Sequence, residues 1–232
     1  MSTARGGVWA VVPVKEFAFA KQRLAGEFTP SFRHRLAQAM LCDVLAALRG
    51  ARQLAGFAVI TADPEAGRLA QDFGGRWLVE TPVRGLNAAV SAAAAVLGAE
   101  GRGGMLVLPG DIPAVTSAEV DALIAGHGAG RAVSLVAAHD GQGTNAVLVS
   151  PPGMMTFAFG PMSFATSRRC AGARLRAAMP RSGAVSRPCA RCRHRGAGAP
   201  ARRSAPLFAH APAAGGRGLP IIDAAGSPAM TI

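Results

Sequence analysis

Short apolar runs alternate with longer amphipathic stretches over the first two thirds of the chain. Mostly apolar runs at 8–14, 57–60, 77–79 and 106–108 predict buried strands. Between the first two runs, apolar positions recur with a helical period and form one stripe: Phe32, Leu36, Met40, Leu41, Val44, Leu45 and Leu48. Strands that alternate with helices in this way predict an α/β fold with a mostly parallel, buried sheet.

Capping residues mark where the predicted helices begin. Thr29 precedes a proline at the first helical position, and Asp63 does the same for the next helix. Thr116 and Glu119 have the spacing of a capping box, which predicts a third helix that ends near Ala125. These signals are local, so they fix helix starts without any knowledge of the tertiary structure.

Two later apolar runs, 132–137 and 145–149, are joined by a short loop. This spacing predicts a hairpin, and therefore an antiparallel element within the sheet. His139 lies on the predicted loop and is interpreted as exposed and not catalytic. His34 and Cys42, on the first long helix, are interpreted as packing or surface residues, because no other side chain stands at metal-ligand spacing from them.

A single carboxylate follows the run at 106–108. Pro109 and Gly110 end the strand, and Asp111 comes next. Open α/β sheets bind ligands beyond the carboxyl ends of their strands, where an aspartate can hold Mg²⁺ against phosphates. The alternative is a turn aspartate that accepts hydrogen bonds from nearby backbone N–H groups.

Three cations and a glycine-led helix form a second group of candidates. Lys15, Lys21 and Arg23 follow the first strand, where positive charge suits a triphosphate, although a solvated basic loop has the same composition. Gly85 and Asn87 open an alanine-rich helix and can offer backbone N–H groups and an amide to a ligand. A glycine turn with an asparagine cap is the structural alternative. The chain has no P-loop motif.

Composition divides the chain at about residue 166. The net charge of +12 suggests a nucleic-acid binder, yet residues 1–166 hold 13 basic and 12 acidic residues. Residues 167–232 hold 12 arginines and one acid, Asp223. No apolar run is long enough to span a bilayer, and the N-terminus lacks a signal-peptide pattern, so a cytoplasmic protein without a membrane partner is expected.

Several short motifs, taken in order, resemble the CofC/FbiD guanylyltransferases. The matching segments are 13–15 (Pro-Val-Lys), 21–24 (Lys-Gln-Arg-Leu), 85–89 (Gly-Leu-Asn-Ala-Ala), 108–113 (Leu-Pro-Gly-Asp-Ile-Pro), 143–146 (Gly-Thr-Asn-Ala) and 159–164 (Phe-Gly-Pro-Met-Ser-Phe). Each motif alone is weak, and their shared order makes the resemblance specific. It covers about residues 8–166.

The resemblance implies a nucleotide-diphospho-sugar-transferase-like fold, which is a three-layer, Rossmann-like α/β domain with a mostly parallel mixed sheet. It implies a guanylyltransferase of coenzyme F-420 biosynthesis. Such an enzyme condenses GTP with 2-phospho-L-lactate, phosphoenolpyruvate or 3-phospho-D-glycerate into a diphospho-5'-guanosine product and pyrophosphate. Mg²⁺ is the implied cofactor. The implied partners are GTP and the phosphorylated acid, and a homodimer is left open.

The resemblance also implies roles for individual residues. Asp111 would be the catalytic residue and the metal ligand. Thr144, Gly160 and Ser163 would hold the phosphorylated acid; the last two can present a backbone N–H and a hydroxyl, or can be a glycine turn and a serine cap. The nucleotide side would comprise Lys15, Lys21, Arg23, Gly85 and Asn87.

The chain departs from the family pattern after Thr166. The family carries a second acidic motif, Asp-x-Asp-Thr-Pro-x-Asp, whereas Asp223 is the one acid beyond this point. We therefore expect a nucleotidyltransferase domain at 1–166 and a disordered or irregular tail at 167–232, rich in Arg, Ala, Gly and Pro. A frameshift and a natural basic tail both explain this composition; an alternative reading frame that encodes the missing motif would identify the frameshift.

Two other functions are compatible with parts of the sequence. One is a related nucleotidyltransferase, such as a molybdopterin guanylyl- or cytidylyltransferase, although a glycine-rich loop after the first strand is missing. The other is a nucleic-acid-binding protein that acts through the arginine-rich tail. Cys189, Cys192 and His194 could form half of a zinc site, but only Cys170 and His210 could complete it, at irregular spacing.

Overall fold

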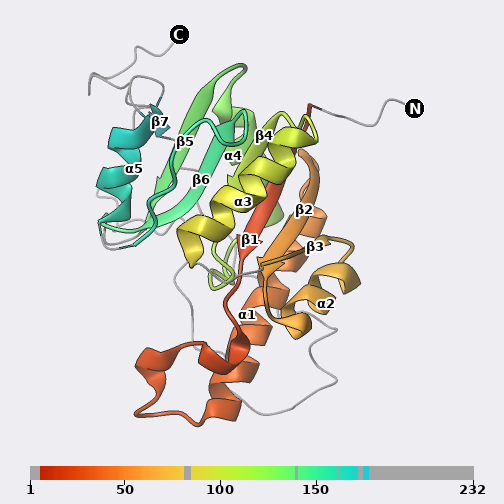
Figure 1. The fold of residues 1–232 in the computed structure, drawn as a ribbon, viewed down its shortest axis with the longest axis vertical. Helices are drawn as coiled ribbons and strands as arrows, with labels where there is room; N and C mark the ends of the chain where they lie inside the picture. The colour runs from red at the N-terminus through yellow and green to blue at the C-terminus, as the bar shows by residue number, and fades with distance from the viewer. Residues whose placement is uncertain (1–5, 81–84, 139–140, 161, 172–174, 178–232) are drawn as a thin grey trace, which may run out of the picture.

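A seven-stranded sheet organises the protein. The computed structural model describes residues 6–80, 85–138, 141–160, 162–171 and 175–177. The strand order is β3-β2-β1-β4-β6-β5-β7 (Figure 1). The strands are β1 (Val8–Pro13), β2 (Leu54–Thr61), β3 (Arg76–Val79), β4 (Gly104–Val107), β5 (Ala132–Ala137), β6 (Thr144–Ser150) and β7 (Leu175–Ala177).

Helices cover both faces of this sheet, so the predicted three-layer α/β architecture is confirmed. The helices are α1 (Pro30–Gly50), α2 (Pro64–Asp72), α3 (Leu86–Ala99), α4 (Ser117–His127) and α5 (Ser163–Ala171). Two 3₁₀ turns, η1 (Phe17–Phe19) and η2 (Gln22–Leu24), lie between β1 and α1. Helices α1, α2 and α4 share one core with the sheet, while α3 and α5 share the other (Figure 1).

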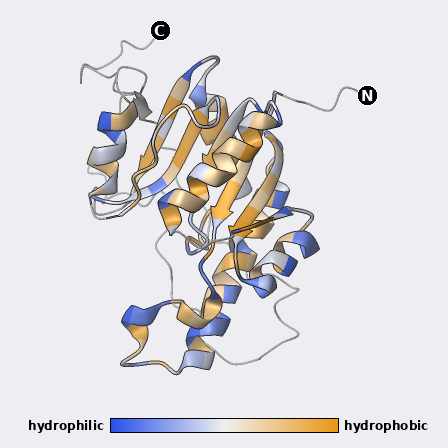
Figure 2. Ribbon diagram, in the orientation of Figure 1, coloured by the Kyte–Doolittle hydropathy of each residue, from blue (hydrophilic) through white to orange (hydrophobic). Residues whose placement is uncertain are grey.

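The two cores follow from the alternation of side chains along the strands. In β1, Ala10 and Val12 face the core of α1, whereas Val11 faces the core of α3. All three side chains are fully buried. Figure 2 shows the result as mostly apolar strands in the middle of the molecule, with hydrophilic residues gathered on the helices and loops around them. Sequence runs that are apolar on both faces are typical of such a covered parallel sheet.

The local signals predict the helix starts correctly. The Thr29 side chain accepts a hydrogen bond from the Phe32 N–H at 3.3 Å. Asp63 accepts one from the Glu65 N–H at 2.8 Å, and both hydrogen bonds of the Thr116–Glu119 capping box are present. The hairpin is confirmed as well, because β5 and β6 pair antiparallel. α4 runs two residues past the expected end, to His127.

The folded part of the chain continues beyond the expected domain limit. Thr166 lies inside α5, which runs to Ala171, and β7 then pairs parallel with β5. Ser167 and Ala171 are buried on α5, so small side chains form its inner face. Their low hydrophobicity hid this helix from the sequence pattern. His139, residues 178–232 and the Cys189–Cys192–His194 group lie outside the described residues.

A search of the described residues finds no helix with both the length and the apolar character needed to cross a bilayer.

Candidate functional site

The loops that carry the predicted site residues meet at one edge of the sheet. β1 and β4 are parallel neighbours, so their carboxyl ends lie together. β6 runs antiparallel to β4, with Val107 opposite Val147. Because the two strands run in opposite directions, Thr144, the first residue of β6, lies near the carboxyl end of β4. The site is therefore built from the ends of β1 and β4 and the beginning of β6.

Asp111 and Lys21 contact each other at this edge. The Lys21 Nζ donates to Asp111 Oδ2 at 2.7 Å, with the two side chains 25% and 56% exposed. Gly110 lets the Asp111 loop pack closely, because a Cβ there would lie 3.2 Å from Val14 Cγ2. A larger residue at 110 would crowd the side chains at the end of β1. The pair is accessible to solvent, so its members are free to meet a ligand.

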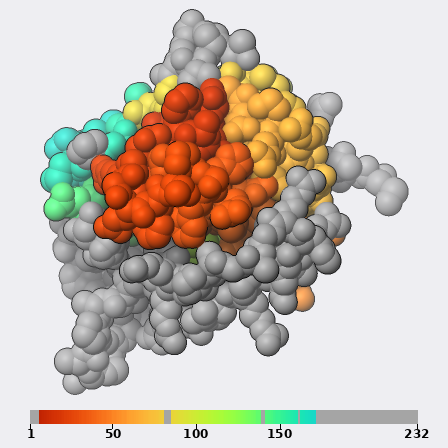
Figure 3. Space-filling model, turned by 90° about the horizontal axis from the view of Figure 1, so that it is seen from below, coloured from red at the N-terminus to blue at the C-terminus, as the bar shows by residue number. Residues whose placement is uncertain are grey.

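The segment between β1 and α1 holds the other cations. Lys15 and Arg23 are exposed, and neither has an ion-pair partner among the residues that the structure describes. Lys21 adopts a left-handed conformation, with φ of 52° and ψ of 41°. Viewed from below, this segment and α1 form a continuous part of the surface, coloured red to orange (Figure 3). Three positive side chains on one segment make this a suitable surface for a polyanion.

Thr144 and Ser163 form a second polar pair. The Ser163 Oγ donates to Thr144 Oγ1 at 3.0 Å, and the two residues are 3% and 8% exposed, respectively. Gly160 leads into this pair, because its carbonyl accepts from the Ser163 N–H at 3.1 Å. Its φ of 143° is accessible mainly to glycine. The structure thus brings together the three residues expected to hold the acid.

Asn87 joins the two halves of the site. Its Nδ2 donates to the Phe159 carbonyl at 3.1 Å, and its Oδ1 accepts from the Phe159 N–H at 2.7 Å. Both ends of the amide are therefore used to fix the backbone next to Gly160. Gly85 is the N-cap of α3, with φ of 90°, and its carbonyl accepts from the Ala89 N–H. The geometry gives Asn87 a positioning contact that sequence reasoning did not anticipate.

The single carboxylate of Asp111 fits a metal ion that is bound partly by substrate and water, and not one that is enclosed by protein ligands. Within the described part of the chain, no three His, Cys, Asp or Glu side chains gather into a metal-binding group. Mg²⁺ in nucleotide sites uses one or two carboxylates together with substrate phosphates and water. One exposed aspartate is compatible with this mode of binding.

Sequence reasoning missed a buried histidine at the opposite edge of the sheet. His127 contacts the hydroxyls of Ser134 at 2.8 Å and Ser150 at 3.0 Å. His127 and Ser134 are 3% and 0% exposed. The His127–Ser134 pair is shut off from solvent, so the histidine is interpreted as a link from α4 to β5 and β6 and not as part of a catalytic site.

Comparison with known proteins shows which family the chain belongs to. The sequence model described as "Guanylyl transferase CofC like" matches residues 8–177. The chain belongs to this family. A phosphoenolpyruvate guanylyltransferase of Rubrobacter xylanophilus is 39% identical over 79% of this chain and 85% of its own. A 2-phospho-L-lactate guanylyltransferase of Methanothermobacter thermautotrophicus is 37% identical over 67% of each chain.

A solved structure supports the fold of this CofC-family chain. A nucleotide-diphospho-sugar transferase from Desulfovibrio desulfuricans G20 superposes with a TM-score of 0.53, at 14% identity, over 64% of this chain and 65% of that one. The predicted transferase-like fold is thereby confirmed. The family match also makes the chain a nucleotidyltransferase of the guanylyltransferase type, which favours the predicted family over the molybdopterin-type and nucleic-acid-binding alternatives.

Proposed function

We propose that this protein transfers the guanylyl group of GTP to the phosphate of phosphoenolpyruvate or 2-phospho-L-lactate, with 3-phospho-D-glycerate as a third candidate. The product is a diphospho-5'-guanosine compound that enters coenzyme F-420 biosynthesis, and pyrophosphate is released. The observation that carries the proposal is the placement of the Lys21–Asp111 pair and the Thr144–Ser163 pair at one edge of the sheet. A cytoplasmic location belongs to the same proposal, because GTP is a cytoplasmic substrate.

The reaction needs charge compensation more than proton transfer. A phosphate oxygen of the acid attacks the α-phosphorus of GTP, and the bond from that phosphorus to the bridging oxygen of the β-phosphate breaks. The attacking oxygen is already anionic at neutral pH, so no general base is required. The barrier is the repulsion between two polyanions, and preorganised positive groups lower it.

The nucleotide side supplies these positive groups. Lys15, Lys21 and Arg23 face the triphosphate, and the Lys21 ammonium stabilises the negative charge that develops on pyrophosphate. Gly85 lets the N-terminus of α3 approach the nucleotide closely, and the backbone N–H groups there favour an anion. Mg²⁺ would be held by Asp111 and would add charge compensation at the phosphates.

The acid side orients its substrate through hydroxyl groups. The Ser163 hydroxyl donates its hydrogen bond to Thr144 Oγ1. The Thr144 O–H therefore remains available to donate to an oxygen of the acid. The backbone around Gly160, fixed by Asn87, adds N–H donors close to the same position. Together they would fix the attacking phosphate in line with the leaving pyrophosphate, and this alignment accelerates transfer.

A direct assay tests the proposal. The purified full chain is incubated with GTP, Mg²⁺ and each of the three acids, and both pyrophosphate and the guanylylated acid are measured by mass spectrometry. We expect product with phosphoenolpyruvate or 2-phospho-L-lactate, less product with ATP or CTP in place of GTP, and none without an acid. Pyrophosphate release that does not depend on any acid, or no product with all three, would refute the proposed function.

A further inference from the structure

Two residues outside the predicted site bind the segment that carries the three basic residues of the site. We infer that Asp63 and Arg33 are positioning residues, which fix residues 14–25 in the conformation that presents Lys15 and Lys21 to the nucleotide. This inference rests on the proposed function for its kinetic consequence. The structural part, that the two residues order the segment, is independent of any activity.

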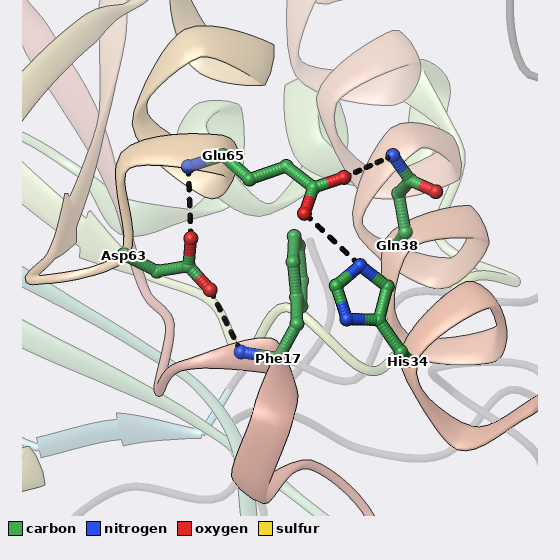
Figure 4. Close-up of polar contacts among 5 residues, drawn as sticks. All are labelled: Phe17, His34, Gln38, Asp63 and Glu65. Atoms are coloured by element: carbon green, nitrogen blue, oxygen red, sulfur yellow. Dashed lines mark hydrogen bonds and ion pairs between the residues drawn. The ribbon is translucent and has the colours of Figure 1, made fainter. Parts of the chain in front are cut away.

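Asp63 uses its two carboxylate oxygens for two different segments. Oδ1 accepts from the Glu65 N–H at 2.8 Å and caps α2. Oδ2 accepts from the Phe17 N–H at 2.8 Å, across 46 residues of sequence (Figure 4). Asp63 is 9% exposed, so the second hydrogen bond is shielded from water. A helix cap needs only one of these oxygens; the other ties the start of η1 to the end of β2.

Side chains of α1 and α2 also surround Phe17. Phe17 is 2% exposed, and its ring lies 5.3 Å from the His34 ring, centroid to centroid. His34 Nε2 and Gln38 Nε2 contact the two carboxylate oxygens of Glu65, at 3.0 and 2.9 Å (Figure 4). The helices on either side of the segment are thus joined to each other and to its first turn. Phe17 cannot move without breaking buried contacts.

Arg33 holds the segment at a second point. It lies near the start of α1, is 6% exposed, and its NH1 donates to the Ala20 carbonyl at 3.2 Å. Its Nε is buried without a hydrogen-bond partner among the described residues. Burying a guanidinium is unfavourable, and the hydrogen bond to the Ala20 carbonyl offsets part of that cost, so the arginine and the segment hold each other in place.

The Ala20 contact lies immediately before the residue that meets Asp111. Lys21 has φ of 52°, a conformation that is unfavourable for residues with a β-carbon. Fixing the preceding carbonyl favours this conformation, in which the Lys21 ammonium reaches Asp111 Oδ2 at 2.7 Å. Without the anchors, the segment would sample other conformations, and GTP binding would have to order it again.

The Asp63→Ser variant separates the anchor from the cap. Serine is among the preferred N-cap residues, but it has one short oxygen and cannot serve both N–H groups. Asp121→Ser is the matched control. Asp121 also accepts from the backbone of another segment, the Arg52 and Gln53 N–H groups at 2.8 Å each, at the opposite edge of the sheet. The Asp121→Ser variant therefore loses the same kind of interaction and leaves residues 14–25 unchanged.

Arg33 is tested by Arg33→Met, which keeps an unbranched side chain but removes the donor. Arg33→Lys restores one donor, so its segment should be more ordered than in Arg33→Met and less ordered than in the wild type. Arg35→Met is the control, because Arg35 is exposed on the same helix. If Arg33→Met does not fold, Arg33→Lys and Asp63→Ser still decide the question.

Two measurements are made on each folded variant. We expect amide hydrogen exchange at Phe17, Phe19, Ala20 and Leu24 to become about tenfold faster in Asp63→Ser and Arg33→Met, the scale of one lost hydrogen bond to a charged group. We expect KM for GTP to rise about tenfold while KM for the acid stays unchanged. The controls should change neither.

The outcomes distinguish the inference from the proposed function. Unchanged exchange in this segment, or equal changes in the control variants, would overturn the anchoring role. Faster exchange with an unchanged KM for GTP would overturn the kinetic role. A wild-type chain that does not turn over GTP would refute the proposed function, and hydrogen exchange would still judge the anchors.

Discussion

The Lys21 ammonium pairs with the Asp111 carboxylate at 2.7 Å, across 90 residues of sequence. The contact brings the loops after β1 and β4 together at the edge where an α/β sheet binds its ligands. The pair is partly exposed to solvent, and such pairs contribute about 0–1 kcal/mol to stability. In the proposed reaction, Lys21 would exchange Asp111 for a phosphate at little cost, and the carboxylate would then be free to bind Mg²⁺.

Replacing Asp111 tests this arrangement directly. We expect Asp111→Asn to lower turnover by about 10²–10³, the scale of losing one transition-state electrostatic contact. The free energy of unfolding should change little, because the side chain is exposed and its ion pair is weak. Steady-state kinetics and urea unfolding measure the two quantities, with Asp121→Asn as a control. Normal turnover would remove Asp111 from the mechanism.

The Thr144–Ser163 pair is expected to set the affinity for the acid. Thr144→Val and Ser163→Ala each remove one hydroxyl, which should raise KM for the acid at a cost of about 1–3 kcal/mol and leave KM for GTP nearly unchanged. The two hydroxyls are hydrogen-bonded to each other, so the double variant should lose less than the sum of the single losses, by at least about 0.5 kcal/mol. Equal effects on both substrates would mean that the pair is structural.

Strands and helix starts could be predicted because their signals are local. The run that became β1 is apolar on both faces, and Thr29, Asp63 and Thr116 cap N–H groups within three residues of themselves. The last helix was harder to see. Its inner face includes Ser163 and Ser167, whose burial depends on packing against β5 and leaves no apolar stripe in the sequence.

The candidate site could be predicted as a set of residues but not as a set of contacts. Motif order placed Lys21, Asp111 and Asn87 among the candidates, yet the Lys21–Asp111 and Asn87–Phe159 contacts join residues 90 and 72 positions apart. Asp63 was predicted only as a helix cap, because nothing in the local sequence shows that its second oxygen binds Phe17. Non-local pairing of this kind follows from the sheet topology.

Asn87 distinguishes positioning from direct nucleotide contact. In Asn87→Asp, a carboxylate oxygen replaces the Nδ2 donor and faces the Phe159 carbonyl. We expect a loss of about 1 kcal/mol in the free energy of unfolding and a rise in KM for the acid, because Gly160 follows Phe159. Ser91→Ala, on the same helix, is the control. A rise in KM for GTP alone, without loss of stability, would assign Asn87 to the nucleotide.

Glu100 should give the protein a pH-dependent contribution to stability, away from the candidate site. Burial would raise the pKa of this carboxyl, but hydrogen bonds and charge from Arg76 and Arg102 outweigh it and lower the pKa below 4.5. The two guanidinium groups lie 2.8 and 3.0 Å from the carboxylate and contact the Trp9 ring from 5.3 and 4.6 Å. The cluster connects β3, the end of α3 and β1.

The sign of the effect follows from the lowered pKa. A carboxyl that is more acidic when folded stabilises the protein above its unfolded pKa, and this contribution is lost as pH falls through the folded value. Glu100→Gln should therefore reduce the free energy of unfolding at neutral pH by about 0.5–1 kcal/mol, and the difference should shrink below pH 4.5. Urea unfolding across this pH range measures the difference.

Glu27→Gln, at an exposed carboxylate without an ion pair among the described residues, should show no such trend. A Glu100→Gln difference that stays constant with pH would show that packing on Trp9, and not the carboxylate charge, stabilises this cluster.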